Sequence, residues 1–415
     1  MSKSLVPEDW VVVILGFIII GLSLGGVLLA APDFAWSSSA DLTGKVFTYA
    51  NLLKIGLQFV YVLVIALTGA FLNGKSILGV LKAFPIVYLL TIIALVMAGS
   101  SQMKALNLEA VIFSLVIGLL IGNLTKLPTW FREALASEFY VKIGLVLLGA
   151  SIIFSDILKA GSLGLIQALV VVLSVWYFSF WLCKKLKIDP ELAMMLSSAV
   201  SICGVSAAIA TSGAIKGDSK KLSLVISLVL ITAVPMMIFM PYIAKLLGLS
   251  QEVTGAWLGG SIDTTGAVVA SGSLVGETAL KISSIVKFSQ NVLLGVAAFA
   301  ISVYWTYTKH PAGKDADTKP TLKVIWERFP KFVIGFIAAS VLFSFFISTD
   351  TAATVKNPLK NLQGLWFALA FTSIGLETNF RDLINKESRR PVYAFLIAQT
   401  FNVIVTLAIA YFLFK

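Results

Sequence analysis

An aspartate and a lysine lie inside two consecutive apolar stretches of this chain, each long enough to cross a membrane. Asp263 stands in "GGSIDTTGAVVASG", about ten residues from each end of its stretch, and Lys287 stands in "SSIVKFSQNVLL", about a third of the way into the next. A charge at mid-membrane costs about 2.5–3.5 kcal/mol, so such side chains usually pair with one another or line a polar cavity. An ion pair that a proton, a cation or an anion breaks and remakes would be a coupling device, whereas a static pair would only join two helices.

Small and hydroxyl-bearing residues surround both charges. Around Asp263 they could line a polar cavity, and they are Gly259, Gly260, Ser261, Thr264, Thr265 and Gly266. Asn291 follows Lys287 by four positions and therefore shares its helical face. The alternative for Asp263 is a carboxylate that caps a helix near an interface.

A second polar stretch, "SICGVSAAIATSG" at 201–213, lies inside an earlier apolar stretch. Gly204 and Ser206, with Thr211, Ser212 and Gly213, weaken a helix, and a break here would expose N–H groups and hydroxyls to a substrate. The alternative is that small residues only let helices approach closely. Glu377, at the end of its apolar stretch, is a weaker candidate, because a solvated terminal carboxylate is the commoner outcome there.

The composition indicates a polytopic membrane protein. Hydrophobic residues make up 58% of the 415 residues and charged residues 13%, against about 45–50% and about 25% in soluble domains. The apolar runs predict an all-α fold of about thirteen spans, near 10–31, 50–72, 76–98, 108–125, 140–158, 162–183, 190–215, 222–244, 253–272, 279–306, 330–348, 364–380 and 391–414.

The net charge of +11 lies mainly in short loops, with no basic patch interleaved with aromatic residues, so we expect no nucleic-acid partner. Alternation through thirteen spans puts Lys184, Lys185 and Lys187 on the same side as the amino terminus, together with the basic loops 309–331 and 381–390. The amino terminus is therefore predicted to be cytoplasmic. The cluster of Lys216, Lys220 and Lys221 falls on the opposite side and argues against this orientation.

Several classes of function are disfavoured. His310, the single histidine, lies in a polar loop, so histidine-based metal sites and general bases within the membrane are not expected. "GLSLG" at 21–25 fits the GxSxG pattern and "GAFLNGKS" at 69–76 fits GxxxxGK[ST], but each lies within or directly after a predicted apolar helix. Both motifs act at a strand-to-helix turn, so neither match indicates a membrane hydrolase or an ATP-driven pump. We expect a protein that is not an enzyme and has no cofactor beyond a coupling Na⁺ or H⁺.

An internal repeat is visible in "GASIIFSDIL" at 149–158 and "GLETNFRDLI" at 375–384, which share Gly, Phe and Asp at equal spacing. The copies lie seven predicted spans apart, and an odd number inserts them in opposite directions, as in inverted-topology repeats. The alternative is that Gly and Asp merely end helices.

The order of "SICGVSAAIAT", "GGSIDTTGAVVASG", "IVKFSQNVLL" and "FTSIGLETNFRDL" resembles the YeiH family, described as sulfate exporters, from about residue 45 to the end. The resemblance places the chain near sodium/proton antiporters and bile-acid symporters, which have inverted repeats, discontinuous helices and an elevator-type core moving against a panel. It implies that Ser201, Cys203, Gly204 and Ser206 form one part of the site, and Asp263, Thr264, Thr265 and Lys287 another. Many family members have His in place of Asp263, which leaves sulfate and the coupling ion open.

We therefore expect N-terminal panel helices in 1–135, a transport core in 136–306, a basic cytoplasmic loop in 307–331 and C-terminal helices completing the repeat in 332–415. The resemblance implies a secondary transporter of a small anion such as sulfate, a sulfonate or a carboxylate, coupled to H⁺ or Na⁺, in a bacterial plasma membrane; a homodimer stays open. The alternative is a cation carrier that uses Asp263 and Lys287. On either hypothesis, Asp263→Asn and Lys287→Ala should each abolish coupled transport and leave the protein folded.

Overall fold

The computed structural model describes residues 5–105, 110–215, 217–309, 326, 329–378 and 389–415. Within these ranges regular structure is helical, and the β-bridge between Trp36 and Ser100 stands outside any strand. His310, Lys216, most of the predicted loop 307–331 and residues 379–384 of the second repeat copy lie outside the described residues.

Six of the described helices are long and apolar enough to cross a membrane. They are α3 (Tyr49–Leu72), α4 (Ile77–Ala98), α9 (Phe154–Lys185), α12 (Ser219–Leu246), α15 (Glu277–Lys309) and α19 (Arg389–Phe414). The predicted class, an all-α polytopic membrane protein, is confirmed, whereas the number of spans stays a prediction.

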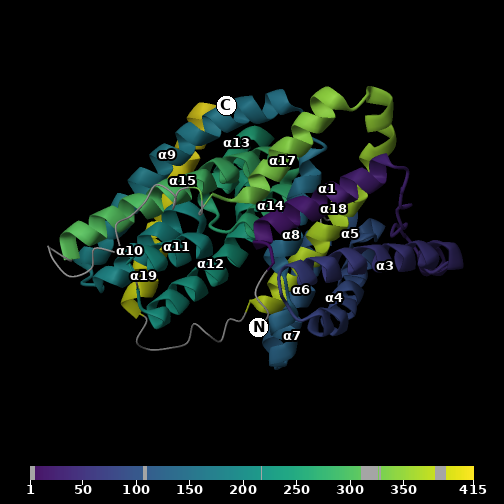
Figure 1. Ribbon diagram of the computed structural model, residues 1–415, viewed down its shortest axis with the longest axis horizontal. Coiled ribbons are helices and arrows are strands. Elements are labelled where there is room, and N and C mark those ends of the chain that lie inside the picture. Colours follow the sequence, from purple (N-terminus) through teal and green to yellow (C-terminus); the bar gives the residue numbers. More distant parts are fainter. Residues whose placement is uncertain (1–4, 106–109, 216, 310–325, 327–328, 379–388) are drawn as a thin grey trace. The chain divides into compact units, whose positions relative to one another are not determined.

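The chain forms two compact units (Figure 1). Unit 1 comprises residues 1–155 and 331–379, and unit 2 comprises residues 156–330 and 380–415. Besides α3 and α4, the elements of unit 1 are α1 (Glu8–Leu24), α2 (Ser39–Asp41), η1 (Leu42–Val46), α5 (Ser101–Ala105), α6 (Ala110–Leu124), α7 (Thr129–Ala134), α8 (Ser137–Gly149), α17 (Lys331–Val341), η4 (Leu342–Phe346) and α18 (Thr349–Glu377). The segments marked η are single π-helical turns.

Unit 2 contains two apolar stretches that are each split into two half-helices. The first runs as α10 (Pro190–Ser198), the π-helical turn η2 (Ala199–Cys203) and α11 (Val205–Ile215), and the second as α13 (Gln251–Ser261) and α14 (Thr265–Val275). The continuous helices α12 and α15 each pack against both α11 and α14, and α19 packs against α13 and η2. The predicted break near Gly204 is therefore present, and a second break lies at Asp263, between α13 and α14.

The described structure differs from the predicted boundaries around residue 150. The sequence predicts spans over 140–158 and 162–183, but α8 ends at Gly149 and α9 begins at Phe154, whose N–H donates to Ser344 Oγ at 3.0 Å. Gly149 packs so tightly that a Cβ there would lie 2.3 Å from the Phe336 carbonyl oxygen. These contacts join the end of α8 and the start of α9 to residues 336–344 of unit 1, whose first segment ends at residue 155. The predicted division at 135/136 stays a prediction.

The segment 332–415 is likewise divided, at 379/380. Both copies of the Gly–Phe–Asp repeat, at 149–158 and 375–384, thus span the points where the chain passes from unit 1 into unit 2. The internal repeat and its inverted topology stay predictions.

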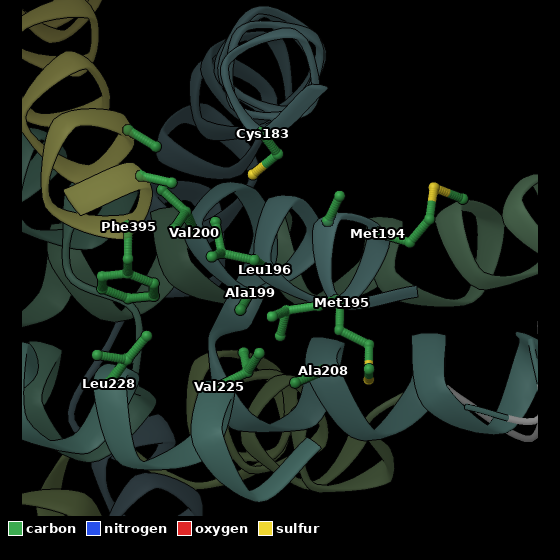
Figure 2. Packing of buried hydrophobic residues seen from close by; sticks show 14 of the residues in the cluster. Cys183, Met194, Met195, Leu196, Ala199, Val200, Ala208, Val225, Leu228 and Phe395 are labelled. Carbon is green, nitrogen blue, oxygen red and sulfur yellow. The ribbon is translucent and has the colours of Figure 1, made fainter. Parts of the chain in front are cut away.

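The apolar core of unit 2 lies around the first split stretch (Figure 2). Side chains from α9, α10, η2, α11, α12 and α19 meet there, including Cys183, Met195, Leu196, Val200, Ala208, Val225 and Phe395. All seven are at most 1% exposed. Burial of apolar surface stabilises the folded state by about 25 cal/mol per Å². This packing fixes η2, and with it the first break.

Candidate functional site

The two breaks of unit 2 touch each other. Gly204 follows η2 with φ +58°, a conformation that glycine adopts without steric cost. A Cβ built at Gly204 would lie 3.0 Å from Asp263 Cβ and 2.7 Å from Val229 Cγ1. Only a residue without a side chain fits between the breaks, so Gly204 is needed for both the turn and the contact.

We predict that Gly204→Ala lowers the free energy of unfolding, because a left-handed backbone costs an L-residue about 1–2 kcal/mol and the Cβ clashes add to this. Thermal unfolding of the purified protein measures the loss. Gly56→Ala in α3 is the matched control, since a Cβ there meets nothing within 4 Å. Equal melting temperatures for the two variants would contradict the assigned role of Gly204.

Each break leaves backbone carbonyls without a hydrogen-bond partner in their own helix. Lys287 on α15 donates to one such carbonyl at each break. Its Nζ donates to Ile202 O at 3.0 Å, to Ile262 O at 2.9 Å and to Gln290 Oε1 at 2.8 Å. Lys287 is 1% exposed. A cation is favoured here because the C-terminal ends of half-helices carry partial negative charge.

Two amide side chains link the breaks in the same way. Gln290 Nε2 donates to Ser201 O at 2.9 Å and Gly260 O at 3.3 Å. Asn402 Nδ2, on α19, donates to Val200 O at 3.0 Å and Ser261 O at 3.3 Å. We call Lys287, Gln290 and Asn402 the crossing clamp. Because a buried backbone group without a hydrogen-bond partner costs about 1–3 kcal/mol, the clamp is what allows the two helices to unwind inside unit 2.

Asp263 is not the partner of Lys287. No ion pair joins the two side chains in the described part of the chain, because the three ammonium protons are donated to the two carbonyls and Gln290. Asp263 is 2% exposed, and its Oδ2 has no hydrogen-bond partner among the described residues. The expected Asp263–Lys287 ion pair is thus replaced by a clamped lysine and, beside it, a buried carboxylate oxygen left open for a further group.

The amino-terminal ends of α11 and α14 begin at the breaks. Thr264 caps α14, its hydroxyl accepting from Ala267 N at 3.4 Å, and Asn291 Nδ2 donates to Thr265 Oγ1 at 3.3 Å. Thr264 and Thr265 are half-buried, and Ser206 in the first turn of α11 is exposed. Helix amino termini carry partial positive charge and free N–H groups, so this end of the crossing suits an anion.

Most of the predicted site residues lie in unit 2 at the breaks: Ser201, Cys203, Gly204, Ser206, Asp263, Thr264, Thr265, Lys287 and Asn291. Two of them are buried in η2. The Ser201 hydroxyl donates to Ser197 O of α10 at 2.7 Å, and Cys203 is 7% exposed and not in a disulfide.

Glu377, the weaker of the predicted site residues, lies in unit 1 and not beside the breaks of unit 2. It ends α18 in unit 1, where its carboxylate accepts from Ser137 N at 3.2 Å and from Ser137 Oγ at 2.5 Å. Ser137 is the first residue of α8, so the carboxylate caps that helix at its positive end. Unit 2 forms its crossing without Glu377.

The sequence alone did not single out the amides of the last helix. Gln399 Nε2 donates to Ser261 O at 2.8 Å beside Asn402, and Gln167 Nε2 on α9 donates to Ala256 O at 2.8 Å. A signal was present in "IAQTFNVIV", where two amides three positions apart share one face of an apolar helix.

The chemistry available at the crossing is electrostatic. The Asp263 carboxylate could hold a proton or, with neighbouring hydroxyl and carbonyl oxygens, a sodium ion. In the part of the chain that the structure describes, no group of three or more His, Cys, Asp or Glu side chains could hold a metal ion.

Comparison with known proteins gives a consistent set of relatives. The family model "Conserved hypothetical protein 698" matches residues 82–394. A UPF0324 membrane protein of Rhodopirellula baltica is 42% identical over 367 residues, which cover 85% of this chain and 67% of the relative. A UPF0324 membrane protein of Nitratidesulfovibrio vulgaris is 39% identical over 356 residues, covering 82% of this chain and 60% of the relative.

The chain thus spans 60–67% of the length of these first relatives. A third, the UPF0324 membrane protein of Nitrosomonas europaea, is 31% identical over 334 residues, covering 72% of this chain and 66% of the relative. No solved structure matches the chain.

Proposed function

This chain belongs to the UPF0324 family of membrane proteins, and we propose that it is a secondary active transporter of a small anion. The observation that carries the proposal is the crossing in unit 2, where the amino termini of α11 and α14 begin beside the unpartnered oxygen of Asp263. Unwound backbone at membrane depth is found where it is buried in protein or lines a cavity, and in transporters it forms the substrate site.

The cargo that suits this site is a sulfate, a sulfonate or a small carboxylate. Free N–H groups of the first turns of α11 and α14 would donate to its oxygens, together with the hydroxyls of Ser206 and Thr265. Lys287 would not touch the cargo, because its three protons are already donated within the clamp. Its charge would still favour an anion through the low-dielectric interior.

Asp263 would supply the coupling. An ionised carboxylate beside the anion site repels the cargo, so anion binding requires that Asp263 first take up a proton or a Na⁺ ion. Uptake of the cargo and of the coupling ion would then be linked by the same side chain. The buried position of Asp263 makes this linkage strong, because water screens little there.

Alternating access would be of the elevator type, with unit 2 as the core and unit 1 as the panel. The proposal is supported by the fact that every residue of the crossing belongs to unit 2. We place the protein in a bacterial plasma membrane with its amino terminus in the cytoplasm, acting as a carrier rather than an enzyme.

A cation carrier is the second candidate, and the unpartnered Asp263 Oδ2 favours it. In that case Na⁺ or H⁺ would be the cargo, and the α11 and α14 amino termini would have no ligand.

Transport in proteoliposomes separates the two candidates. Purified full-length protein is reconstituted, and electrical currents and pH changes are recorded after adding Na⁺ alone, each of a panel of anions alone, and both together. An anion transporter should respond only when an anion is present. A response to Na⁺ or a pH gradient without any added anion would overturn the anion proposal and support the cation carrier.

A further inference from the structure

A column of side chains with a cation at its end runs along one face of α9. Trp176, Phe180 and Lys184 follow at intervals of four residues, which places them on one helical face. The Trp176 and Phe180 rings stack with centroids 5.0 Å apart at 22°, and Lys184 Nζ lies 4.4 Å from the centroid of Phe180. Lys184 belongs to the last turn of α9, so the aromatic column ends in a positive charge near the end of a spanning helix.

Opposite this column, α15 presents small side chains. Ala297 and Ala300, with Ile301 and Tyr304, face the column across a cavity of about 480 Å³, whose floor includes Met194 of α10. We call this cavity the α9–α15 groove. Its volume falls in the range of about 300–1,000 Å³ that ligand sites occupy.

The column is held in place before any ligand arrives. Trp176 Nε1 donates to Ser198 Oγ of α10 at 3.2 Å, which fixes the indole against its neighbour. The rim is amphipathic: the Tyr177 and Tyr304 side chains are 65% and 46% exposed, as is typical of aromatic residues at the boundary between hydrocarbon and headgroups.

Lys184 forms no ion pair with any of the residues that the structure describes. It is exposed. The groove therefore combines a long apolar wall with one unneutralised cation at its end. A ligand that matches both has an apolar chain and an anionic head.

We propose that the α9–α15 groove binds an anionic phospholipid, with an acyl chain along Trp176 and Phe180 and the phosphate at Lys184. The bilayer around α9 and α15 supplies this ligand at high local concentration. A soluble anion would leave the apolar wall uncovered, and in a zwitterionic lipid the headgroup's own cation would offset the attraction of its phosphate to Lys184. The inference rests on the geometry of α9, α10 and α15 and holds whether or not the chain transports an anion.

The test uses purified full-length protein in detergent with dioleoylphosphatidylglycerol, and dioleoylphosphatidylcholine as the neutral comparison. Native mass spectrometry measures the dissociation constant for each lipid. We expect wild type to bind phosphatidylglycerol more tightly, and Lys184→Gln to weaken that binding about fivefold, since one such cation near the membrane surface contributes about 1 kcal/mol.

Lys185→Gln is the matched control. Lys185 is the next residue of the same helix and lies over a different ring, with Nζ 5.1 Å from the Trp181 centroid, and it does not line the groove. Its replacement removes the same charge from the same turn and should leave phosphatidylglycerol binding unchanged. Equal weakening in the Lys184 and Lys185 variants would show that surface charge alone attracts the lipid and would overturn the proposal.

Two further experiments test the role of the apolar part of the α9–α15 groove. Ala300→Phe fills the groove without changing charge and should abolish the preference for phosphatidylglycerol; unchanged binding would overturn the proposal. Glycerol 1-phosphate, the headgroup without acyl chains, should not compete with the lipid. Competition at equal concentration would assign the site to a soluble phosphate instead. Thermal unfolding in phosphatidylcholine confirms that each variant is folded.

Discussion

Asp263→Asn should abolish gradient-driven uptake while leaving anion binding in place. Asparagine has the shape of aspartate, but it can neither take up a proton nor carry the charge that a Na⁺ ion neutralises. The wild-type affinity for the anion should rise on acidification or on addition of Na⁺, because either neutralises the carboxylate. The variant should instead bind with one affinity at every pH and Na⁺ concentration.

Neutralising Asp263 should change the wild-type affinity for the anion by about 100-fold. This corresponds to about 2.5–3.5 kcal/mol, the free-energy cost of a charge at membrane depth. Binding is measured by titration calorimetry, and uptake with a radiolabelled anion in proteoliposomes under an imposed gradient. Glu252→Gln, an exposed carboxylate in the first turn of α13, is the control and should behave as wild type. Full gradient-driven uptake in Asp263→Asn would remove this residue from the coupling.

Lys287→Ala should lower stability strongly, which differs from the sequence-based expectation of a folded but inactive protein. The substitution leaves the Ile202 and Ile262 carbonyls and the Gln290 side chain without their donor. A buried group without a partner costs about 1–3 kcal/mol, so the two carbonyls alone account for about 2–6 kcal/mol.

Thermal unfolding in detergent checks this prediction. Lys281→Ala is the matched control, because Lys281 precedes Lys287 on the same helix and is half-buried. We expect Lys281→Ala to unfold near the wild-type temperature and Lys287→Ala well below it. If Lys287→Ala unfolds at the same temperature as wild type and loses only transport, then Lys287 acts on the cargo. The clamp would then not be what holds the breaks together.

The sequence predicts the class of the protein and the position of the first break, because these depend on local features. Apolar runs of spanning length identify membrane helices, and the cluster of glycine and hydroxyl-bearing residues that includes Gly204 weakens a helix. At Asp263 the sequence predicts a polar site, because a charge is costly inside a membrane helix. Both residues lie at breaks of the described structure.

The partners of the buried polar groups could not be predicted in the same way. Sequence shows that Lys287 needs a partner, and the nearest charge was Asp263; its actual acceptors are backbone carbonyls, which every residue possesses and no pattern marks. Glu377 was assigned to the site for its charge, but the end of α8 that it caps comes from a segment 240 residues earlier. Contacts of this kind are fixed by tertiary packing.

The crossing clamp also has a consequence for how the chain is made. Asn402 holds the carbonyl of Val200, which is 202 residues earlier in the sequence. Synthesis proceeds at about 5–20 residues per second, so Asn402 is made about 10–40 s after Val200. During that interval the Val200 carbonyl has no amide donor from α19, and a buried carbonyl without a partner costs about 1–3 kcal/mol. A chain interrupted before α19 should therefore hold its first break less firmly than the full chain.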